Sequence, residues 1–165
     1  MILSRDDLKA RIAVLKEEGK RIVFTNGCFD ILHIGHVKYL EEAKRLGDIL
    51  VLGLNSDASV QSIKGPLRPV VPEDERAYLL ASLKVVDYVT IFNEDTPLAL
   101  IEDIGPDILV KGGDWSQDTV VGGESVEKRG GKVVIVPQFN GTGADHPAST
   151  SSVIERIITA YKKGS

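Results

Sequence analysis

The sequence predicts an α/β fold: a single-domain, Rossmann-like doubly wound sheet of about five parallel strands with helices on both faces. Short runs rich in Ile, Val and Leu alternate with segments of helical spacing, which is the pattern of βαβ units. The runs are apolar at consecutive positions, as in strands that a parallel sheet buries on both faces. These strands are predicted at 21–25, 49–54, 88–92, 108–110 and 132–136.

Capping signals place the helices between and around these strands. Ser4 is a typical N-cap for the first helix and Gly19 a typical end. Thr96 and Pro97 form an N-cap and N1 pair for another helix, which Gly105 stops. The predicted helices are 5–18, 35–46, 73–84, 97–104, 119–129 and 150–162. An N-terminal helix therefore precedes an α/β core at about 20–162, and the 165 residues form one domain, a size that supports one core.

Composition and charge exclude several classes of protein. The net charge of −4 leaves no broad basic face, so we expect no nucleic-acid partner. The single cysteine, Cys28, rules out an internal disulfide framework and fits a reducing compartment. No apolar stretch is long enough to cross a bilayer, and the N-terminus turns acidic too early for a signal peptide. We therefore expect a cytoplasmic protein that does not bind membranes.

The most informative motif is His33-Ile34-Gly35-His36, which follows the first strand and opens a helix. Residues three apart share one face of a helix. Unpaired N–H groups and the helix dipole make the first turn a seat for phosphate, to which two imidazoles could donate hydrogen bonds. Gly35 removes a side chain that would hinder close approach of a ligand. The motif therefore predicts a phosphate site.

Two other interpretations of the histidine pair stay open on four residues alone. A metal site would need further ligands, and Cys28 and Asp30 lie close by, although the spacing is not that of zinc sites. Alternatively, the two imidazoles only cap a turn. On the phosphate interpretation, no protein side chain is a predicted metal ligand.

Ligands of doubly wound sheets bind beyond the carboxyl ends of the strands. The segments directly after the predicted strands are 26–36, 55–57, 93–95, 111–115 and 137 onward, so these should meet at one edge. The first of them is neither a G-x-G-x-x-G fingerprint nor a P-loop. If a nucleotide binds, the histidine motif is therefore the candidate to hold its phosphates.

Four hydroxyl residues, 149–152, begin the last helix. They can cap its N–H groups, and they can equally donate to a phosphate on that helix end. Four hydroxyl residues are more than capping requires. This favours the interpretation that they bind phosphate, with the N-termini of two helices converging on one polyphosphate.

Three cations are candidates to neutralise charge in the transition state of a phosphoryl-type transfer. Lys64 and Arg68 lie in a stretch with two prolines that we predict to be a loop, a plausible flap over the site. Arg76 starts a helix, where a cation is unfavourable unless an anion compensates it. For each, an ordinary exposed charge is the alternative.

An ordered set of motifs resembles the cytidylyltransferase-like nucleotidyltransferases, and among them the adenylyltransferases of ADP-heptose synthesis. The motifs are GCFDILHIGH (27–36), LGD (46–48), NSD (55–57), Arg76, VDYV (86–89), KGGDW (111–115) and STS (149–151). The resemblance implies transfer of AMP from ATP to a sugar 1-phosphate, giving an ADP-sugar and pyrophosphate. It implies no covalent intermediate, and Mg²⁺ held mostly by phosphate oxygens.

The resemblance also implies roles for individual residues. The implied catalytic residues are His33, His36, Lys64 and Arg76. The implied nucleotide-binding residues are Asn26, Gly27, Cys28, Phe29, Gly35, His36, Lys111, Gly112, Asp114, Ser149, Thr150 and Ser151. The implied substrate-binding residues are Asp30, Asn55, Lys64 and Arg68.

Two alternative functions stay open. Glycerol-3-phosphate cytidylyltransferases carry Arg-Thr-x-Gly-Ile before the Ser-Thr pair, but residues 140–148 lack that arginine, which favours ATP over CTP. The other alternative is a nucleotide-binding module without turnover. His146 in the same stretch has no predicted role. For the enzyme we expect a homo-oligomer, a separate sugar kinase upstream, and a product used in lipopolysaccharide synthesis.

Overall fold

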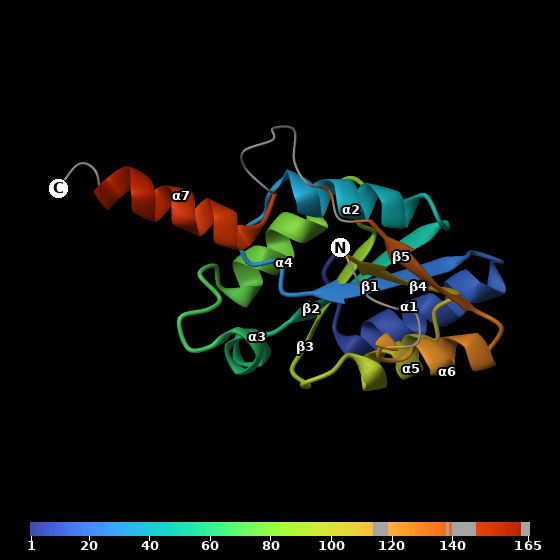
Figure 1. Cartoon of the computed structure of the whole chain (residues 1–165). Helices are drawn as coiled ribbons and strands as arrows, with labels where there is room; N and C mark the ends of the chain where they lie inside the picture. The colour runs from blue at the N-terminus through green and yellow to red at the C-terminus, as the bar shows by residue number, and fades with distance from the viewer. Residues whose placement is uncertain (114–118, 138, 140–147, 163–165) are drawn as a thin grey trace.

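Five parallel strands form the centre of the molecule in the order β3-β2-β1-β4-β5 (Figure 1). The computed structural model describes residues 1–113, 119–137, 139 and 148–162. The strands are β1 (Ile22–Gly27), β2 (Ile49–Asn55), β3 (Tyr88–Phe92), β4 (Ile108–Gly112) and β5 (Lys132–Val136). The predicted α/β fold with a parallel sheet of five strands is therefore confirmed.

Helices cover both faces of this sheet (Figure 1). One face packs against α1 (Arg5–Glu17), α5 (Leu98–Ile104) and α6 (Gly123–Lys128), and the other against α2 (Ile34–Lys44) and α4 (Glu73–Ala81). Alternate residues of β1 point into the hydrophobic cores on the two sides of the sheet: Phe24 packs on the side of α1, α5 and α6, and Val23 on the side of α2 and α4. Because successive side chains of a strand point to opposite faces, a strand between two layers must be apolar throughout.

The strand order places a crevice beside β1. Going outward from β1, the chain runs through β2 and β3 on one side and through β4 and β5 on the other. The connections therefore leave β1 in opposite directions, which opens the crevice beyond its carboxyl end. The loop into α2 and the ends of β2 and β4 meet there.

One helix was not predicted. Residues 57–64, for which the sequence analysis predicted no helix, form α3 (Asp57–Lys64), and Lys64, which it placed in a loop, is the last residue of this helix. Ser56 caps the helix, since its hydroxyl accepts a hydrogen bond from the N–H of Ser59 at 3.2 Å. Its eight residues bury only Ser59 and Val60, and so short a segment gives an apolar periodicity too few turns to be read from the sequence.

The other helix boundaries agree with the predicted ones or differ from them by a few residues. Helix α1 begins after Ser4, which caps it as predicted, and Gly105 in the left-handed region ends α5 as predicted. Pro97 is the N-cap of α5 instead of Thr96. The last helix, α7 (Thr150–Lys162), begins as predicted, whereas α6 covers only part of the predicted 119–129. In the described part of the chain, no helix is long and apolar enough to span a membrane.

Candidate functional site

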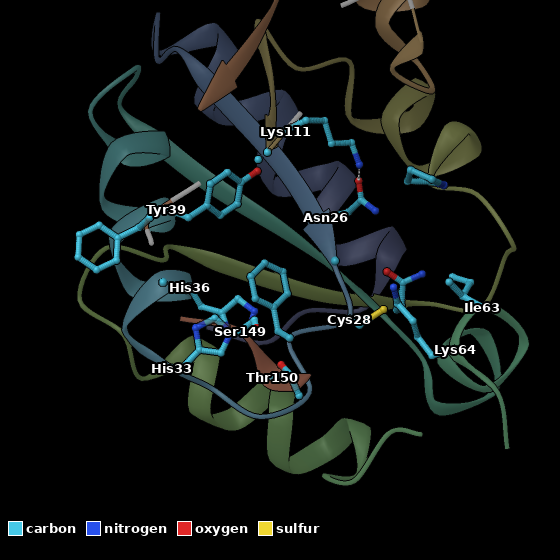
Figure 2. A pocket seen from close by; sticks show the side chains of 18 of the residues that line it. Asn26, Cys28, His33, His36, Tyr39, Ile63, Lys64, Lys111, Ser149 and Thr150 are labelled. Atoms are coloured by element: carbon cyan, nitrogen blue, oxygen red, sulfur yellow. Dashed lines mark hydrogen bonds between the residues drawn. The ribbon is translucent and has the colours of Figure 1, made fainter. Parts of the chain in front are cut away.

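A cavity of about 600 Å³ lies at the carboxyl edge of the sheet, where the sequence places the site. Its lining takes residues from the ends of all five strands or the segments that follow them, together with the starts of α2 and α7. The predicted site residues in this lining are Asn26, Gly27, Cys28, Phe29, His33, Gly35, His36, Asn55, Lys64, Lys111, Gly112, Ser149 and Thr150. Figure 2 labels Asn26, Cys28, His33, His36, Lys64, Lys111, Ser149 and Thr150 around this cavity.

The two histidines of the motif stack on each other at the start of α2. Their ring centroids are 3.8 Å apart with an interplanar angle of 24°, and Phe29 lies against His36 at 5.1 Å. His33 is the N-cap residue of α2, but its side chain makes no capping hydrogen bond. The capping interpretation therefore fails for the imidazole of His33. The N–H of His36 donates to the carbonyl oxygen of His33 at 3.0 Å, and the N–H groups before it in the turn keep their capacity to bind an anion.

Burial keeps both imidazoles neutral. It lowers the pKa of His36 to about 4, with a further contribution from the neighbouring His33, and it lowers the pKa of His33 as well. The Nδ1 atoms of both rings are buried without a hydrogen-bond partner among the described residues. A neutral imidazole still carries one N–H. The pair can therefore donate hydrogen bonds to a ligand without bringing a charge.

Gly35 brings the starts of two helices together. A Cβ atom at this position would lie 2.9 Å from the carbonyl oxygen of Ala148 and 3.0 Å from Nδ1 of His33. The close approach that Gly35 permits is therefore to the segment leading into α7, which is a different partner from the ligand that the sequence suggested. As a result, the N-termini of α2 and α7 open onto the same cavity.

The hydroxyl residues before and within α7 divide into two roles. The hydroxyl of Ser149 accepts a hydrogen bond from the N–H of Ser152 at 3.1 Å, so capping occupies one lone pair of Ser149. Ser149 and Thr150 both line the cavity, but Ser151 is exposed and lies outside the lining. The first two hydroxyls are thus placed for a ligand, and the structure does not bring Ser151 to them.

Two lysines supply the cavity with cationic side chains. Lys111 at the end of β4 donates a hydrogen bond to the side-chain oxygen of Asn26 on β1, across the crevice (Figure 2). Burial lowers the pKa of Lys111 to about 8. Lys64 reaches the lining from the end of α3. Because the histidines are neutral, these lysines are the cationic side chains of the described lining.

The turn after β1 carries a strained aromatic residue. Phe29 has a φ of 44°, in the left-handed region that aromatic side chains rarely adopt. Its ring covers Gly27, where a Cβ atom would lie 2.9 Å from the ring. Burial raises the pKa of the Cys28 thiol, partly offset by Lys64, Arg76 and Arg68. The thiol therefore stays protonated at neutral pH and is a poor nucleophile.

Two predicted substrate-binding residues bind each other instead of lining the cavity. Arg68 donates from Nε to the carboxylate of Asp30 at 2.5 Å, and that carboxylate also accepts from the N–H groups of Val70 and Val71. Burial alone would raise the pKa of Asp30, but these hydrogen bonds and Arg68 hold it below its usual value. Neither residue contributes to the described lining. The pair instead pins the segment between α3 and α4 to the turn after β1.

Arg76, predicted as a catalytic cation, is fully buried and lies outside the lining. Its guanidinium donates to the carbonyl oxygens of Cys28 at 2.6 Å and Asn55 at 2.9 Å, to that of Val71 at 2.9 Å, and to the carboxylate of Asp57 at 2.6 Å. Asp57 is the anion that compensates this cation at a helix start. Arg76 therefore ties the ends of β1 and β2 together and positions the turn that carries Cys28.

Several lining residues were not predicted. Tyr39 lies one turn after His36 and so on the same face of α2, and this spacing could have predicted that it lines the cavity. Its hydroxyl donates to the carbonyl oxygen of Val110 at 3.1 Å and lies 2.6 Å from the hydroxyl of Thr25, while burial raises its pKa. The others were not named as site residues, although Asp95, Gly113, Pro137, Phe139 and Ala148 lie in segments that the sequence places at this edge. The remaining ones, for which the sequence gives no such signal, are Ile63, Thr96, Pro97, Val120 and Val121.

No group of three or more His, Cys, Asp or Glu side chains in the described ranges could hold a metal ion. In the described lining the one carboxylate is that of Asp95. Such a cavity suits a cation that arrives with phosphate ligands and water, as Mg²⁺ prefers. Asp114, predicted to bind the ribose, and His146 lie outside the described residues.

Comparisons with known proteins agree with this geometry. A family model described as cytidylyltransferase-like matches residues 24–156. The bifunctional protein HldE of Syntrophotalea carbinolica is 54% identical over 97% of this chain, and that of Geobacter sulfurreducens is 54% identical over 94%. The chain spans only 31% of the length of either relative.

Solved structures extend the comparison. The lipopolysaccharide core biosynthesis protein from Thermoplasma volcanium is 33% identical, with a TM-score of 0.61 over 73% of this chain and 98% of its own. Pantothenate synthetase from Thermus thermophilus is 17% identical, with a TM-score of 0.59 over 85% of this chain and 62% of its own. The second likeness shows the fold alone.

Proposed function

Because the chain belongs to the cytidylyltransferase-like family of nucleotidyltransferases, we propose that it transfers AMP from ATP to a heptose 1-phosphate. The products would be an ADP-sugar and pyrophosphate. One observation carries the proposal: two helix N-termini, with His33, His36, Ser149 and Thr150, open onto one cavity at the carboxyl edge of the sheet. This arrangement suits a polyphosphate. The choice of a heptose rests on the motif resemblance.

The chemistry is an in-line displacement at the α-phosphorus of ATP. An oxygen of the sugar 1-phosphate forms a bond to that phosphorus while the bond to the bridging oxygen of pyrophosphate breaks. The attacking phosphate is already an anion, so no general base is needed. The raised pKa of Cys28 agrees with a mechanism that has no covalent enzyme intermediate. Catalysis would then be positioning and stabilisation of charge.

In this mechanism the neutral histidines act as hydrogen-bond donors. His33 and His36 would donate to oxygens on the α-phosphate, whose negative charge grows as the attacking oxygen approaches. Buried donors that need no reorganisation are effective at this task, and both rings are held by stacking on each other. The low pKa of His36 means that this role persists well below neutral pH.

We assign the remaining lining by chemistry. Lys111 would bind an anionic part of the nucleotide, and Ser149 with Thr150 would bind the β- and γ-phosphates. Asn55 and Lys64, from the ends of β2 and α3, would meet the acceptor sugar phosphate. The unpredicted apolar residues Val120, Val121 and Phe139 offer a surface against which the adenine could pack.

Mg²⁺ would be held by phosphate oxygens of the bound ATP, completed by water. Asp95, the carboxylate of the described lining, is suited to accept hydrogen bonds from such waters. The ion would supply neutralisation of the triphosphate and of the leaving pyrophosphate. The protein's part is to hold the nucleotide on the two helix N-termini.

Partners and location follow from the same proposal. The relatives are bifunctional and about three times as long, so in them a second activity accompanies this one. For this chain we propose that a sugar kinase supplies the sugar 1-phosphate and that the ADP-heptose enters lipopolysaccharide synthesis. The single cysteine fits the reducing cytoplasm, where we place the enzyme.

The test is a pyrophosphate-release assay with Mg²⁺ that crosses ATP and CTP with heptose 1-phosphates, other sugar 1-phosphates and glycerol 3-phosphate. We expect release with ATP and a heptose 1-phosphate, together with an equal amount of ADP-sugar by mass spectrometry. Release only with CTP and a polyol phosphate would establish the cytidylyltransferase alternative. ATP binding without release across the whole panel would establish a module without turnover.

The matched variants are His33→Ala and His36→Ala. Loss of one preorganised donor to a developing oxyanion lowers kcat by about 100-fold or more. Lys132→Met is the control, because Lys132 is exposed at the start of β5, at the opposite edge of the sheet. Histidine variants that turn over like the control would contradict the proposed role of the pair.

A further inference from the structure

The sheet divides into two halves at its carboxyl edge. Strand β1 pairs with β2 along its whole length, and β4 pairs with β5 along its whole length. Between β1 and β4 the described ladder has two pairs, the second of which joins Phe24 to Leu109. The residues next in register, 25–27 on β1 and 110–112 on β4, are not paired with each other, and we call these two runs the seam. Each half of the sheet therefore continues to the cavity while the two halves separate.

The side chain of Tyr39 bridges this seam from α2. Its hydroxyl donates to the carbonyl oxygen of Val110 at 3.1 Å. A phenol has one proton to donate, so the hydroxyl of Thr25, 2.6 Å away, donates to Tyr39 in turn. Thr25 and Val110 are the first residues of the seam on their strands, and both are fully buried. The Tyr39 hydroxyl thus takes the place of a strand-to-strand hydrogen bond at the point where the ladder ends.

The next residues along the seam belong to the cavity. One residue beyond the bridge, Lys111 donates across the seam to the side-chain oxygen of Asn26 (Figure 2). Both residues line the cavity. The ring of Tyr39 packs on the end of the same strand, because a Cβ atom at Gly112 would lie 3.0 Å from it. Tyr39 therefore holds β4 on both sides of Lys111, through its hydroxyl at Val110 and through its ring at Gly112.

We propose that Tyr39 is a positioning residue, whose hydroxyl holds the seam at the width that places Lys111 beside an anionic part of the bound nucleotide. The inference rests on the proposed function, because it names the residue that prepares the nucleotide subsite of that reaction. The hydroxyl acts through β4 and Lys111, and it does not touch the reacting atoms. Burial raises the pKa of Tyr39, so the phenol keeps the proton that it donates.

Direct contact with the ligand is the competing explanation, since Tyr39 itself lines the cavity. Thr25 separates the two explanations, because it is fully buried and does not belong to the described lining. Thr25→Val keeps the shape of the side chain and removes the donor to Tyr39. A role in positioning predicts that this change reaches the nucleotide, whereas a direct contact predicts that it does not.

The test measures ATP binding by titration calorimetry with Mg²⁺, and turnover by pyrophosphate release. We expect the Kd and the KM for ATP to rise about tenfold in Tyr39→Phe and about threefold in Thr25→Val. The value of kcat and the KM for the sugar 1-phosphate should change by less than about twofold, as for a loss of uniform binding of one substrate. Tyr78→Phe is the matched control, because Tyr78 is 70% exposed on α4 and lies outside the described lining.

A double-mutant cycle tests whether the effect passes through Lys111. In a Lys111→Met background, Tyr39→Phe should raise the Kd for ATP by less than about twofold, because the side chain that it positions is gone. Equal losses of affinity in both backgrounds overturn the proposal. So does a Thr25→Val protein that binds ATP as the wild type does while Tyr39→Phe binds it weakly, since Tyr39 would then contact the ligand.

A measurement on the free protein separates this inference from the proposed reaction. Nuclear magnetic resonance of the lysine side chains follows the pKa of Lys111, which burial lowers to about 8. In Tyr39→Phe this pKa should rise toward its ordinary value of 10.5, because water enters a loosened seam. An unchanged pKa overturns the positioning role. A wild type that binds no nucleotide refutes the proposed function, and the Lys111 titration still decides whether Tyr39 holds the seam.

Circular dichroism at the assay temperature verifies that the variants are folded. If Tyr39→Phe does not fold, Thr25→Val carries the same three measurements, because it breaks the same chain of hydrogen bonds at the other end.

Discussion

Replacing Lys111 by Met should make the protein more stable and at the same time weaken its binding of ATP. Lys111 lines the cavity and its ammonium group donates to the neutral side chain of Asn26. It makes no ion pair with any residue in the described ranges. A partly buried cation without an anion costs free energy, and the protein would tolerate that cost where a ligand supplies the anion.

The size of the effect follows from the pKa of Lys111. Burial lowers it from 10.5 to about 8. At about 1.4 kcal/mol per pKa unit, the charged side chain costs the folded state about 3 kcal/mol below pH 8. Methionine has a similar length and no charge, but it leaves the oxygen of Asn26 without its donor, a loss of about 1 kcal/mol. The free energy of unfolding should therefore rise by about 2 kcal/mol at pH 7.

The pH dependence of stability independently checks the sign of the change in the free energy of unfolding that we expect for Lys111→Met. Below pH 8 the lysine is charged in both the folded and the unfolded protein, so the cost is present in full. Between about 8 and 10.5 the folded protein has lost the proton that the unfolded chain still binds. Stability of the wild type should rise relative to Lys111→Met across this window. Urea unfolding followed by circular dichroism, at pH 7 and at pH 10, measures both differences.

Binding should change in the opposite direction. Loss of a charge-assisted hydrogen bond to a phosphate or other anion raises the Kd for ATP by about tenfold to 100-fold. Titration calorimetry with Mg²⁺ and ATP measures it, with Lys132→Met as a control that should change neither stability nor affinity. A Lys111→Met protein that is less stable than wild type would refute the reasoning, because the ammonium group would then have a compensating anion.

Three further predictions concern the surrounding structure. As the pH falls from about 6.5 to 4, the free energy of unfolding of the wild type decreases, because unfolded His36 binds a proton that the folded ring excludes. In His36→Gln this decrease should be smaller by about 3 kcal/mol, as measured by urea unfolding. Gly35→Ala should cost about 1–3 kcal/mol in thermal unfolding and reduce ATP affinity, since its Cβ would meet the carbonyl oxygen of Ala148 at 2.9 Å. Arg76→Met should destabilise the protein by about 3 kcal/mol in urea, and Lys at this position should not restore it, because Asp57 and three carbonyl oxygens need a planar set of donors.

The fold could be predicted because its determinants are local in the sequence. Buried parallel strands are apolar at nearly every position, so β2 and β5 stand out without any knowledge of their neighbours. The strand order of the sheet is not local, since it depends on which crossover each helix makes. Helix α3 was missed because it has only eight residues, which is too short a window for its apolar spacing to stand out, and because its Ser56 cap was not recognised.

The site could be predicted only where residue type alone decides the chemistry. The position of His33 and His36 after a strand and at a helix start brings them to the ligand edge in any doubly wound sheet. For cations, residue type is not enough. Lys111 and Arg76 are both partly or fully buried, yet one faces the cavity and the other ties together two loops. Which anion or carbonyl each finds depends on tertiary packing that sequence spacing does not encode.

What separates the site from the scaffold is whether the buried polar groups are satisfied. Asp30 and Arg76 have hydrogen-bond partners on several sides, and removing either would leave orphaned groups behind. The Nδ1 atoms of His33 and His36 lack partners in the described structure, the first turn of α2 lacks a side-chain cap, and Lys111 has only a neutral oxygen. A triphosphate offers many acceptor oxygens and negative charge, which would satisfy all of these groups at once. These unsatisfied groups lower the stability of the free protein, and their satisfaction by ATP would contribute to the free energy of binding. The groups that destabilise the fold are therefore the ones that form the site.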